Sequence, residues 1–331
     1  MKNLIIPVFI PHQGCPHQCV FCNQKSISGS SAPPTPDGVR AMLASRLGPD
    51  TPHAIIAFYG GSFTGIPKDL MDEYLNVAVD SVRKGHAAGI RLSTRPDLMD
   101  EAIAGSLKER CVVTVELGVQ SLDDEVLRLS GRGHTADDSI RAAGVVKAAG
   151  LELGIQLMAG LPGDTSERFM DTVRRTVDII PAFVRIYPAV VVKGSPMALM
   201  HERGDYRPLT LDDAVALCRD AVKVFRGAGI RIIRLGLQAG KDLEDAIIEG
   251  PYHPAFGHLV ESAIAFEAMA EMLPCGGATY ITYKVNPAEL SVYRGIRSAN
   301  VERLNALLPG FTVRITADPS VPCGGCSVIS V

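Results

Sequence analysis

Three closely spaced cysteines, Cys15, Cys19 and Cys22, are the residues of this sequence most suited to chemistry. They form a C-x3-C-x2-C run shortly after an apolar segment, Leu4 to Ile10. Three thiolates on one loop can bind three irons of a cubane 4Fe-4S cluster and leave the fourth iron without a protein ligand. The spacing therefore predicts a cluster with one iron open to a small molecule.

Disulfide bonds and zinc are the alternatives for these cysteines. Eight cysteines in 331 residues are few, and the three in this run are too close together to pair in the usual geometry. A structural zinc ion usually needs four ligands, and His12 or His17 could supply the fourth. Disulfides are therefore disfavoured, and zinc stays the alternative to the cluster.

Composition is that of a globular enzyme that we expect in the cytoplasm. The chain is 47% hydrophobic and carries a formal net charge of −3, so a nucleic-acid partner would need a local basic patch. The strongly apolar stretches, Leu4 to Ile10 and Ala189 to Val192, are too short to cross a bilayer. We therefore expect no membrane anchor.

Apolar segments alternate with helical ones along the first two thirds of the chain. Six such units predict an α/β fold with parallel strands and crossover helices, a partial (β/α)6 TIM-like barrel over residues 1–200. Residues 201–331 predict a C-terminal α/β extension, with a strand over Ile230–Leu237, that closes the open side of the barrel or covers its mouth. The predicted strands are Leu4–Ile10, Ala54–Tyr59, Ile90–Thr94, Val112–Val119, Leu151–Met158 and Phe183–Val190, and the helices between them include Asp69–Lys84, Asp97–Arg110, Thr135–Ala149 and Ser166–Ile179.

A glycine turn follows the second predicted strand. Gly60 and Gly61 let the backbone approach a ligand without obstruction by a Cβ atom, and the Ser62 hydroxyl can hydrogen-bond an ammonium group. In a barrel of parallel strands, such turns gather at the C-terminal ends where active sites form. The turn therefore predicts a ligand contact next to the cysteine loop.

Together these motifs resemble the radical SAM superfamily. Within it, the chain is similar to the radical SAM domain of the Elongator catalytic subunit and its bacterial relatives and, more distantly, to the oxygen-independent coproporphyrinogen III oxidases. The resemblance covers roughly residues 3 to 200. It rests on the cysteine run with Phe21 before the third cysteine, the glycine turn, and the segments Ile90–Asp97, Glu116–Ser121, Arg132–Thr135, Gln156–Thr165 and Arg185–Pro188.

The resemblance implies a 4Fe-4S cluster and S-adenosylmethionine as cofactors. Cys15, Cys19 and Cys22 would bind iron, Phe21 would pack near the adenine, and Gly60, Gly61 and Ser62 would meet the methionyl amino group. Gln120 would contact the ribose and Arg132 the carboxylate, which a guanidinium matches in a bidentate way. Ser93 and Gln156 are neutral where the coproporphyrinogen oxidase pattern has acidic residues, so they are either cofactor contacts or polar caps of barrel strands.

Three further residues are candidates for catalysis. Glu116 interrupts an apolar run, so its carboxylate should be paired. It either positions the substrate or Arg95, or forms a structural ion pair with an arginine of a neighbouring strand. Arg185 and Tyr187 alternate on the sixth predicted strand and therefore share one face, where they would line the substrate space.

The predicted activity is reductive cleavage of S-adenosylmethionine to a 5′-deoxyadenosyl radical that abstracts hydrogen from substrate. By resemblance the substrate is a tRNA base, and the electron donor is of the flavodoxin or ferredoxin type. A small-molecule or porphyrin-type substrate is the enzymatic alternative, and a non-catalytic protein that binds a cluster or haem is the other. An acetyl-CoA-dependent domain like that of the Elongator subunit is not evident in this sequence.

A second group of cysteines lies near the C-terminus. Cys323 and Cys326 form a C-x2-C pair with glycines between them, and Cys275 is followed by a similar glycine pair. Such thiols can bind metal or act as a redox dithiol, and they can equally be reduced surface thiols. We expect the three to lie together near the barrel mouth.

Overall fold

The computed structural model describes residues 4–11, 14–23, 33–273, 280–307 and 312–330. These form two compact units, Met1–Thr210 with Ala221–Tyr252, and Leu211–Asp220 with His253–Val331. Each unit is described by itself. The two domains predicted from the sequence, 1–200 and 201–331, stay a prediction.

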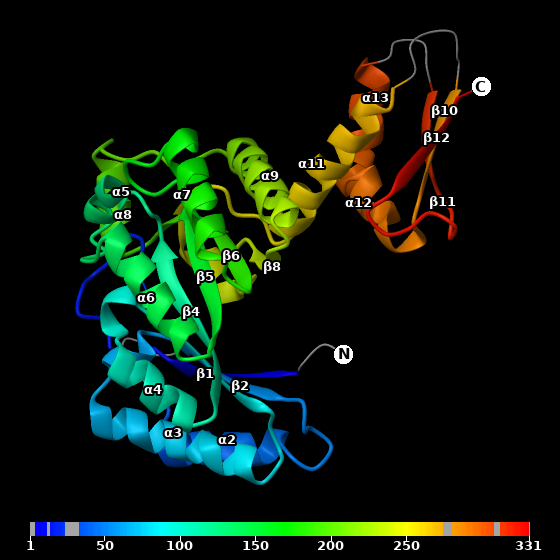
Figure 1. The fold of residues 1–331 in the computed structure, drawn as a ribbon. Helices are drawn as coiled ribbons and strands as arrows, with labels where there is room; N and C mark the ends of the chain where they lie inside the picture. Colours follow the sequence, from blue (N-terminus) through cyan, green and yellow to red (C-terminus); the bar gives the residue numbers. More distant parts are fainter. Residues whose placement is uncertain (1–3, 12–13, 24–32, 274–279, 308–311, 331) are drawn as a thin grey trace. The chain divides into compact units, whose positions relative to one another are not determined.

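A seven-stranded parallel sheet that curls into a half-barrel forms the first unit (Figure 1). Its order is β1-β2-β3-β4-β5-β6-β8, so each of the first six strands lies next to its neighbour in the sequence. This confirms the predicted partial barrel. The strands are β1 (Ile5–Ile10), β2 (Ile55–Gly60), β3 (Gly89–Thr94), β4 (Val112–Gln120), β5 (Glu152–Ala159), β6 (Phe183–Pro188) and β8 (Arg231–Leu235).

The seventh strand was predicted as a strand of the C-terminal extension, between Ile230 and Leu237. In the structure β8 pairs in parallel with β6 and lengthens the barrel sheet. A parallel neighbour needs a long crossover connection, and the helical segment between the two strands is long enough to provide it. A separate antiparallel pair joins β7 (Val191–Val192) to β9 (Ile247–Glu249).

Helices pack against the outer side of this sheet, and polar caps fix where several of them begin. Thr135, where the sequence predicted a helix to begin, caps α6 in a capping box with Asp138. Thr165 caps α7. The helices of this unit are α2 (Pro36–Arg46), α3 (Lys68–Arg83), α4 (Glu101–Glu109), α5 (Asp124–Leu129), α6 (Ala136–Ala148), α7 (Ser166–Ile179), α8 (Pro196–Glu202) and α10 (Lys241–Ala246). Helix α9 (Leu211–Gly227) contributes residues to both units.

One predicted helix start was wrong. The helix after β3 was expected to begin at Asp97, but that segment forms a short 3-10 turn, η2 (Pro96–Leu98), and α4 begins later, at Glu101. The carboxylate of Asp100 caps it by accepting from the Ile103 N–H across 2.7 Å. Asp97 is thereby left free to pair with other side chains at the end of β3.

The second unit packs helices against a small mixed sheet. Strand β10 (Tyr280–Val285) pairs in parallel with β11 (Thr312–Ala317) and antiparallel with β12 (Cys326–Ser330). Met269 of α11 (Phe256–Glu271), Tyr293 of α12 (Leu290–Arg294) and Leu304 of α13 (Ala299–Leu307) are buried against this sheet. Cys275 lies outside the described residues, and Cys323 is exposed just before β12. The expected gathering of these thiols therefore stays a prediction.

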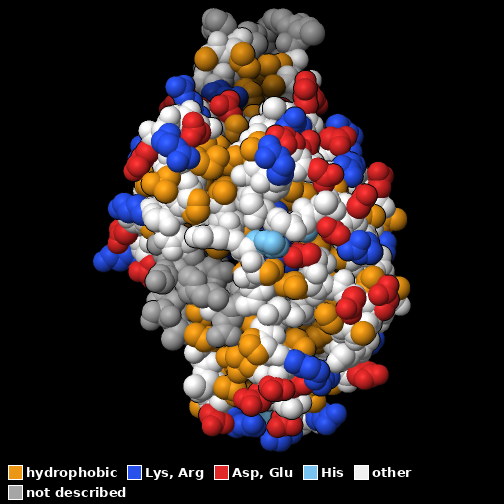
Figure 2. Space-filling view, turned by 90° about the vertical axis from the view of Figure 1, so that its left-hand side faces the viewer, with side chains coloured by type: hydrophobic (Ala, Val, Ile, Leu, Met, Phe, Trp, Pro, Cys, Tyr) orange, Lys and Arg blue, Asp and Glu red, His pale blue; other side chains and the backbone are white. Residues whose placement is uncertain are grey.

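No helix within the described ranges is long and apolar enough to cross a membrane. On the face shown in Figure 2, acidic and basic side chains are interspersed and do not gather by sign. That face therefore offers no broad basic surface.

Candidate cofactor and active site

Backbone contacts from distant parts of the chain hold the cysteine loop, which follows β1. The Val20 N–H donates to the Ser130 carbonyl across 3.0 Å, and the Met197 N–H donates to the Val20 carbonyl across 2.8 Å. Within the loop, the Cys22 N–H donates to the Cys19 carbonyl across 3.1 Å. These backbone hydrogen bonds hold the described part of the loop, residues 14–23, against the segments around Ser130 and Met197.

The cysteine loop also rests directly on the glycine turn that follows β2. Gly14 has φ +74°, and a Cβ atom there would overlap the Ser62 carbonyl oxygen. In the same way, a Cβ at Gly65 would overlap the Gly14 carbonyl. Glycine is required at both positions because two backbones meet there. Gly14 was not among the site residues predicted from the sequence, although a glycine just before a cysteine run is a usable signal.

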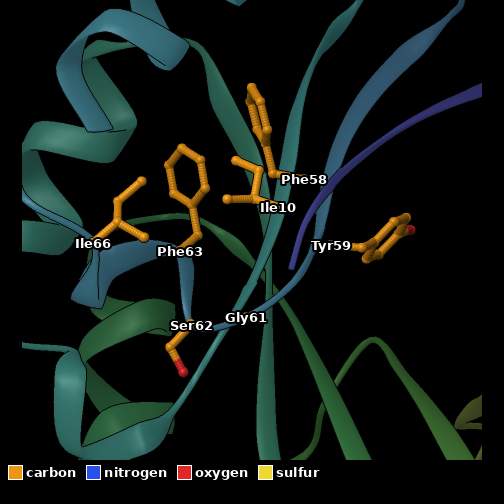
Figure 3. Close-up of a pocket in the computed structure, with 7 residues that line it drawn as sticks. All are labelled: Ile10, Phe58, Tyr59, Gly61, Ser62, Phe63 and Ile66. Atoms are coloured by element: carbon orange, nitrogen blue, oxygen red, sulfur yellow. The ribbon is translucent and has the colours of Figure 1, made fainter. Parts of the chain in front are cut away.

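Ser62 lies beside the cysteine loop, and its predicted ligand contact stays a prediction. Its hydroxyl oxygen lies 3.4 Å from the Cys15 sulfur. Figure 3 shows the Ser62 side chain pointing away from the apolar group formed by Phe58, Phe63 and Ile66. Phe58 and Phe63 stack with ring centroids 4.6 Å apart, which anchors the turn on its apolar side.

The Cys19 sulfur is buried between two guanidinium groups. Nη1 of Arg132 lies 3.1 Å from it, and Nη1 of Arg95 lies 3.8 Å from it. Arg95 is itself held by Asp97, with 3.0 Å between Nε and Oδ1, and it also donates to the Arg132 carbonyl. Charged donors of this kind stabilise a sulfur that carries negative charge. Asp97 balances one of the two cations.

Arg132 belongs to a tightly packed segment that faces the cysteine loop. A Cβ atom at Gly133, which has φ +68°, would overlap the His17 ring. Next to it, the buried His134 places Nδ1 3.7 Å from Asp97 Oδ1. Burial and the nearby Arg132 and Arg95 cations lower the pKa of His134 to about 4, so the ring is neutral at physiological pH.

Two amide side chains lie on neighbouring strands, Gln120 at the end of β4 and Gln156 within β5. Nε2 of Gln156 donates to Oε1 of Gln120 across 3.3 Å. Gln120 has φ +67° at an irregularity of the ladder between the two strands. Its side chain folds back over Gly118, where a Cβ would lie 2.9 Å from Nε2. Ser93 is half-buried on β3 and pairs in register with Glu116.

Phe21 packs between two apolar clusters at the end of the barrel. One cluster contains Met158 and contacts Tyr187, and the other contains Met197 and Tyr206. The structure therefore places Phe21 and Tyr187 against the same cluster. The predicted cofactor contacts of Phe21, Ser93, Gln120 and Gln156 stay proposals.

Glu116 is at the centre of an ion-pair network inside the barrel. Its carboxylate accepts from Arg91 Nε across 2.5 Å and from Arg185 Nε across 2.6 Å. Of the predicted alternatives, the pair with an arginine of the neighbouring strand is present, while Arg95 pairs with Asp97. Gly154 on β5 leaves room for this carboxylate, since a Cβ there would lie 3.1 Å from Glu116 Cγ.

Arg185 extends this network to two phenols. Nη1 donates to the Tyr187 hydroxyl oxygen and Nη2 to the Tyr59 hydroxyl oxygen, each across 3.3 Å. Burial opposes protonation of Arg185, but the Glu116 carboxylate and the two phenols outweigh it and raise the pKa of the guanidinium. Arg185 is therefore charged at any physiological pH.

These residues fit a cubane cluster. Across the part of the chain that the structure describes, no three His, Cys, Asp or Glu side chains converge as ligands of one metal ion. A cubane needs no such convergence, because each thiolate binds a different iron. The buried Cys19 sulfur with its two guanidinium donors, and the glycine cradle around the loop, suit this kind of group.

Comparison with known proteins agrees with this arrangement. The model of the radical SAM superfamily matches residues 9–176, and that of the radical SAM C-terminal domain matches residues 181–265. The tRNA uridine(34) acetyltransferase of Methanocaldococcus infernus is 25% identical over 253 residues, covering 64% of this chain and 47% of that protein. An uncharacterized protein of Methanocaldococcus jannaschii is 28% identical over 232 residues, covering 66% of this chain and 71% of that protein.

Solved structures share the fold. The archaeal Methanocaldococcus infernus Elp3 with an N-terminal deletion has a TM-score of 0.64 at 21% identity, covering 83% of this chain and 65% of that chain. Coproporphyrinogen III oxidase from Escherichia coli, a radical SAM enzyme, has a TM-score of 0.51 at 18% identity over 69% of this chain and 53% of that chain. The chain spans about half the length of the acetyltransferase. Because the superfamily match covers half of the chain, this protein belongs to the radical SAM superfamily of enzymes.

Proposed function

We propose that this enzyme binds a 4Fe-4S cluster through Cys15, Cys19 and Cys22, binds S-adenosylmethionine beside it, and abstracts a hydrogen atom from a tRNA base. The observation that carries the proposal is the Cys19 sulfur, held 3.1 Å from Arg132 on a loop that packs against the glycine turn. When bound, the cluster supplies the electron that cleaves S-adenosylmethionine to a 5′-deoxyadenosyl radical.

The chain's own residues would bind and orient the cofactor. Gly60 and Gly61 expose backbone at the end of β2, and the Ser62 hydroxyl faces the cysteine loop, which suits the methionyl ammonium. The hydrogen-bonded amides of Gln120 and Gln156 suit the ribose hydroxyls.

Arg132 and Phe21 complete the proposed cofactor site. Arg132 Nη2 donates to the Gly118 carbonyl and Nη1 contacts Cys19, so its guanidinium is held in one orientation next to the cluster loop. This orientation suits a carboxylate bound at its remaining edge. Phe21 would cover the adenine, since it packs between two apolar clusters beside the loop.

Support for a tRNA substrate comes from relatives. The proteins named tRNA uridine(34) acetyltransferase match 64% of this chain. Glu116, Arg185 and Tyr187 would line the substrate space, because they form one network on the inner side of the sheet. The electron would come from a flavodoxin- or ferredoxin-type donor.

A single reconstitution series tests this proposal. The protein is reconstituted anaerobically with iron and sulfide, and iron is counted in the parent, in a Cys15, Cys19, Cys22 triple alanine variant, and in Cys111→Ala as a control. We expect about four irons in the parent and the control, and loss of the cluster in the triple variant.

Activity is then measured on the same samples. With dithionite and S-adenosylmethionine, we expect 5′-deoxyadenosine, and more of it when total tRNA is added. Product that does not respond to tRNA would contradict the substrate assignment and favour a small molecule. A cluster without any 5′-deoxyadenosine would favour a binding protein.

A further inference from the structure

The guanidinium of Arg95 is held in one orientation next to the cysteine loop. Asp97 Oδ1 accepts from its Nε across 3.0 Å, and Asp97 Oδ2 accepts from its Nη2 across 3.2 Å. Nη2 also donates to the Arg132 carbonyl oxygen, and Nη1 lies 3.8 Å from the Cys19 sulfur. The Arg95 side chain is 3% exposed, which shields these contacts from solvent. Because Asp97 holds the Nε edge of the guanidinium, Nη1 is directed toward the sulfur.

A short turn brings Asp97 to the side chain of Arg95. In the 3-10 turn η2, the Leu98 N–H donates to the Arg95 carbonyl across 3.2 Å. The Thr64 hydroxyl donates to the Leu98 carbonyl across 2.6 Å. Thr64 belongs to η1 (Phe63–Gly65), which is part of the turn on which the cysteine loop rests. The pair of Arg95 and Asp97 is therefore attached to the same structure that supports the cysteine loop.

Asp97 brings a negative charge into a group of buried cations. Arg95 and Arg132 both approach the Cys19 sulfur, and two guanidinium groups so placed repel each other. Burial and, to a smaller extent, the nearby Arg95 lower the pKa of Arg132. His134, on the other side of Asp97, is neutral at physiological pH. The group of Arg95, Arg132 and Asp97 therefore carries a net charge of +1.

A charge next to a cluster ligand acts unequally on the two oxidation states of the cluster. The reduced cluster carries one more negative charge than the oxidised one, so a nearby cation favours reduction and a nearby anion opposes it. Arg95 and Arg132 would therefore raise the reduction potential, and the carboxylate of Asp97 would lower it. A cluster with a lower potential is the stronger reductant.

We propose that Asp97 is a positioning residue that directs Arg95 at Cys19 and, through its own charge, keeps the reduction potential of the proposed cluster low. This inference rests on the proposed binding of a 4Fe-4S cluster and adds a residue that regulates its potential. The two effects of Asp97 have opposite signs, because the contact of Arg95 favours reduction while the carboxylate opposes it. Substitutions that remove charge and keep the side-chain shape separate the two.

The test measures iron content and reduction potential in anaerobically reconstituted protein, the potential by redox titration followed by electron paramagnetic resonance. Asp97→Asn removes the charge and keeps an oxygen that can accept from Arg95. Reduction should become about tenfold more favourable, which is a rise of about 59 mV for one electron. Arg95→Gln removes one cation and should shift the potential in the opposite direction. Asp97→Glu keeps the charge, and its potential should lie closer to that of the parent than the potential of Asp97→Asn does.

Asp205→Asn is the matched control. Asp205 also pairs with the arginine two residues before it, with 2.9 Å between Arg203 Nε and Asp205 Oδ2. Both of these side chains are more than half exposed, so solvent screens their charges. Iron content and reduction potential should therefore equal those of the parent.

An unchanged or lower potential in Asp97→Asn, with its iron retained, would overturn the inference, and so would a raised potential in Arg95→Gln. If Asp97→Asn loses its iron, the direction of the shift in Arg95→Gln decides. Loss of iron in both variants, with normal iron in Asp205→Asn, would overturn the inference too, because the pair would then only support the loop. A parent without a cluster would contradict the proposed function itself, whereas a cluster whose potential ignores Asp97 contradicts this inference alone.

Discussion

The guanidinium of Arg132 donates to the sulfur of Cys19 across 3.1 Å, although 113 residues separate them in the chain. Arg132 was predicted as the residue that binds the S-adenosylmethionine carboxylate. The structure shows that it also contacts a proposed iron ligand. We therefore expect replacement of Arg132 to affect both the cluster and the binding of S-adenosylmethionine.

Arg132→Ala should lower the reduction potential of the cluster. A charged donor stabilises the reduced cluster more than the oxidised one, because the reduced cluster carries more negative charge. Losing a hydrogen bond worth about 1.5–3 kcal/mol would lower the reduction potential by roughly 60 to 130 mV at most. S-adenosylmethionine binding should weaken about a hundredfold. Redox titration followed by electron paramagnetic resonance measures the first effect. Arg128→Ala, at an exposed arginine paired with Glu125, should change neither the reduction potential nor the affinity for S-adenosylmethionine. An unchanged potential in Arg132→Ala would contradict a contact between Arg132 and the cluster.

Glu116→Ala should destabilise the fold strongly. The carboxylate side chain is 4% exposed and pairs with both Arg91 and Arg185. Removing one partner of a buried pair leaves uncompensated charge and typically costs about 3–5 kcal/mol. Urea unfolding measures this cost. The control is Glu125→Ala, whose partner Arg128 is mostly exposed and whose loss should cost much less. Similar values for the two variants would show that the network contributes little.

Gly14→Ala should prevent cluster binding. A Cβ there would overlap the Ser62 carbonyl, so the cysteine loop would have to move away from the glycine turn. Gly85→Ala is the matched control, because Gly85 also has φ +74° but has open space around it. The control should lose only about 1–2 kcal/mol of stability through backbone strain and keep its iron. Normal iron content in Gly14→Ala would show that the loop tolerates the displacement.

Asp164→Asn should change how stability depends on pH. The Gly160 N–H donates to Asp164 Oδ2 across 2.9 Å, and burial raises the pKa of the carboxyl from 3.8 to about 6. Between these values the unfolded chain releases a proton that the folded chain keeps, so stability falls as pH rises from about 4 to 6. The effect is at most roughly 2–3 kcal/mol. Asn keeps an acceptor and cannot ionise, so the free energy of unfolding of the variant, relative to the parent, should increase over that pH range in urea titrations. A constant difference in unfolding free energy between pH 4 and 7 would refute the raised pKa.

Local patterns in the sequence determined much of the fold and the site. The spacing of Cys15, Cys19 and Cys22, the glycine pair after β2 and the runs of aliphatic residues each act within a few residues. A loop, a turn or a strand can therefore be predicted from them. The alternation of Arg185 and Tyr187 also placed both on one face of β6, because side chains of a strand alternate between its two sides.

Only the tertiary structure decided which of these residues meet. Strand β8 pairs with the barrel sheet, and Asp100 caps the helix that was expected to begin near Asp97. Glu116 forms ion pairs with Arg91 and Arg185, and Arg132 donates to Cys19. Partners so far apart in the chain depend on strand order, register and crossover packing, which are set by the burial of the whole core. A local pattern identifies a charged side chain that needs a partner, while the assembled sheet determines which partner lies within reach.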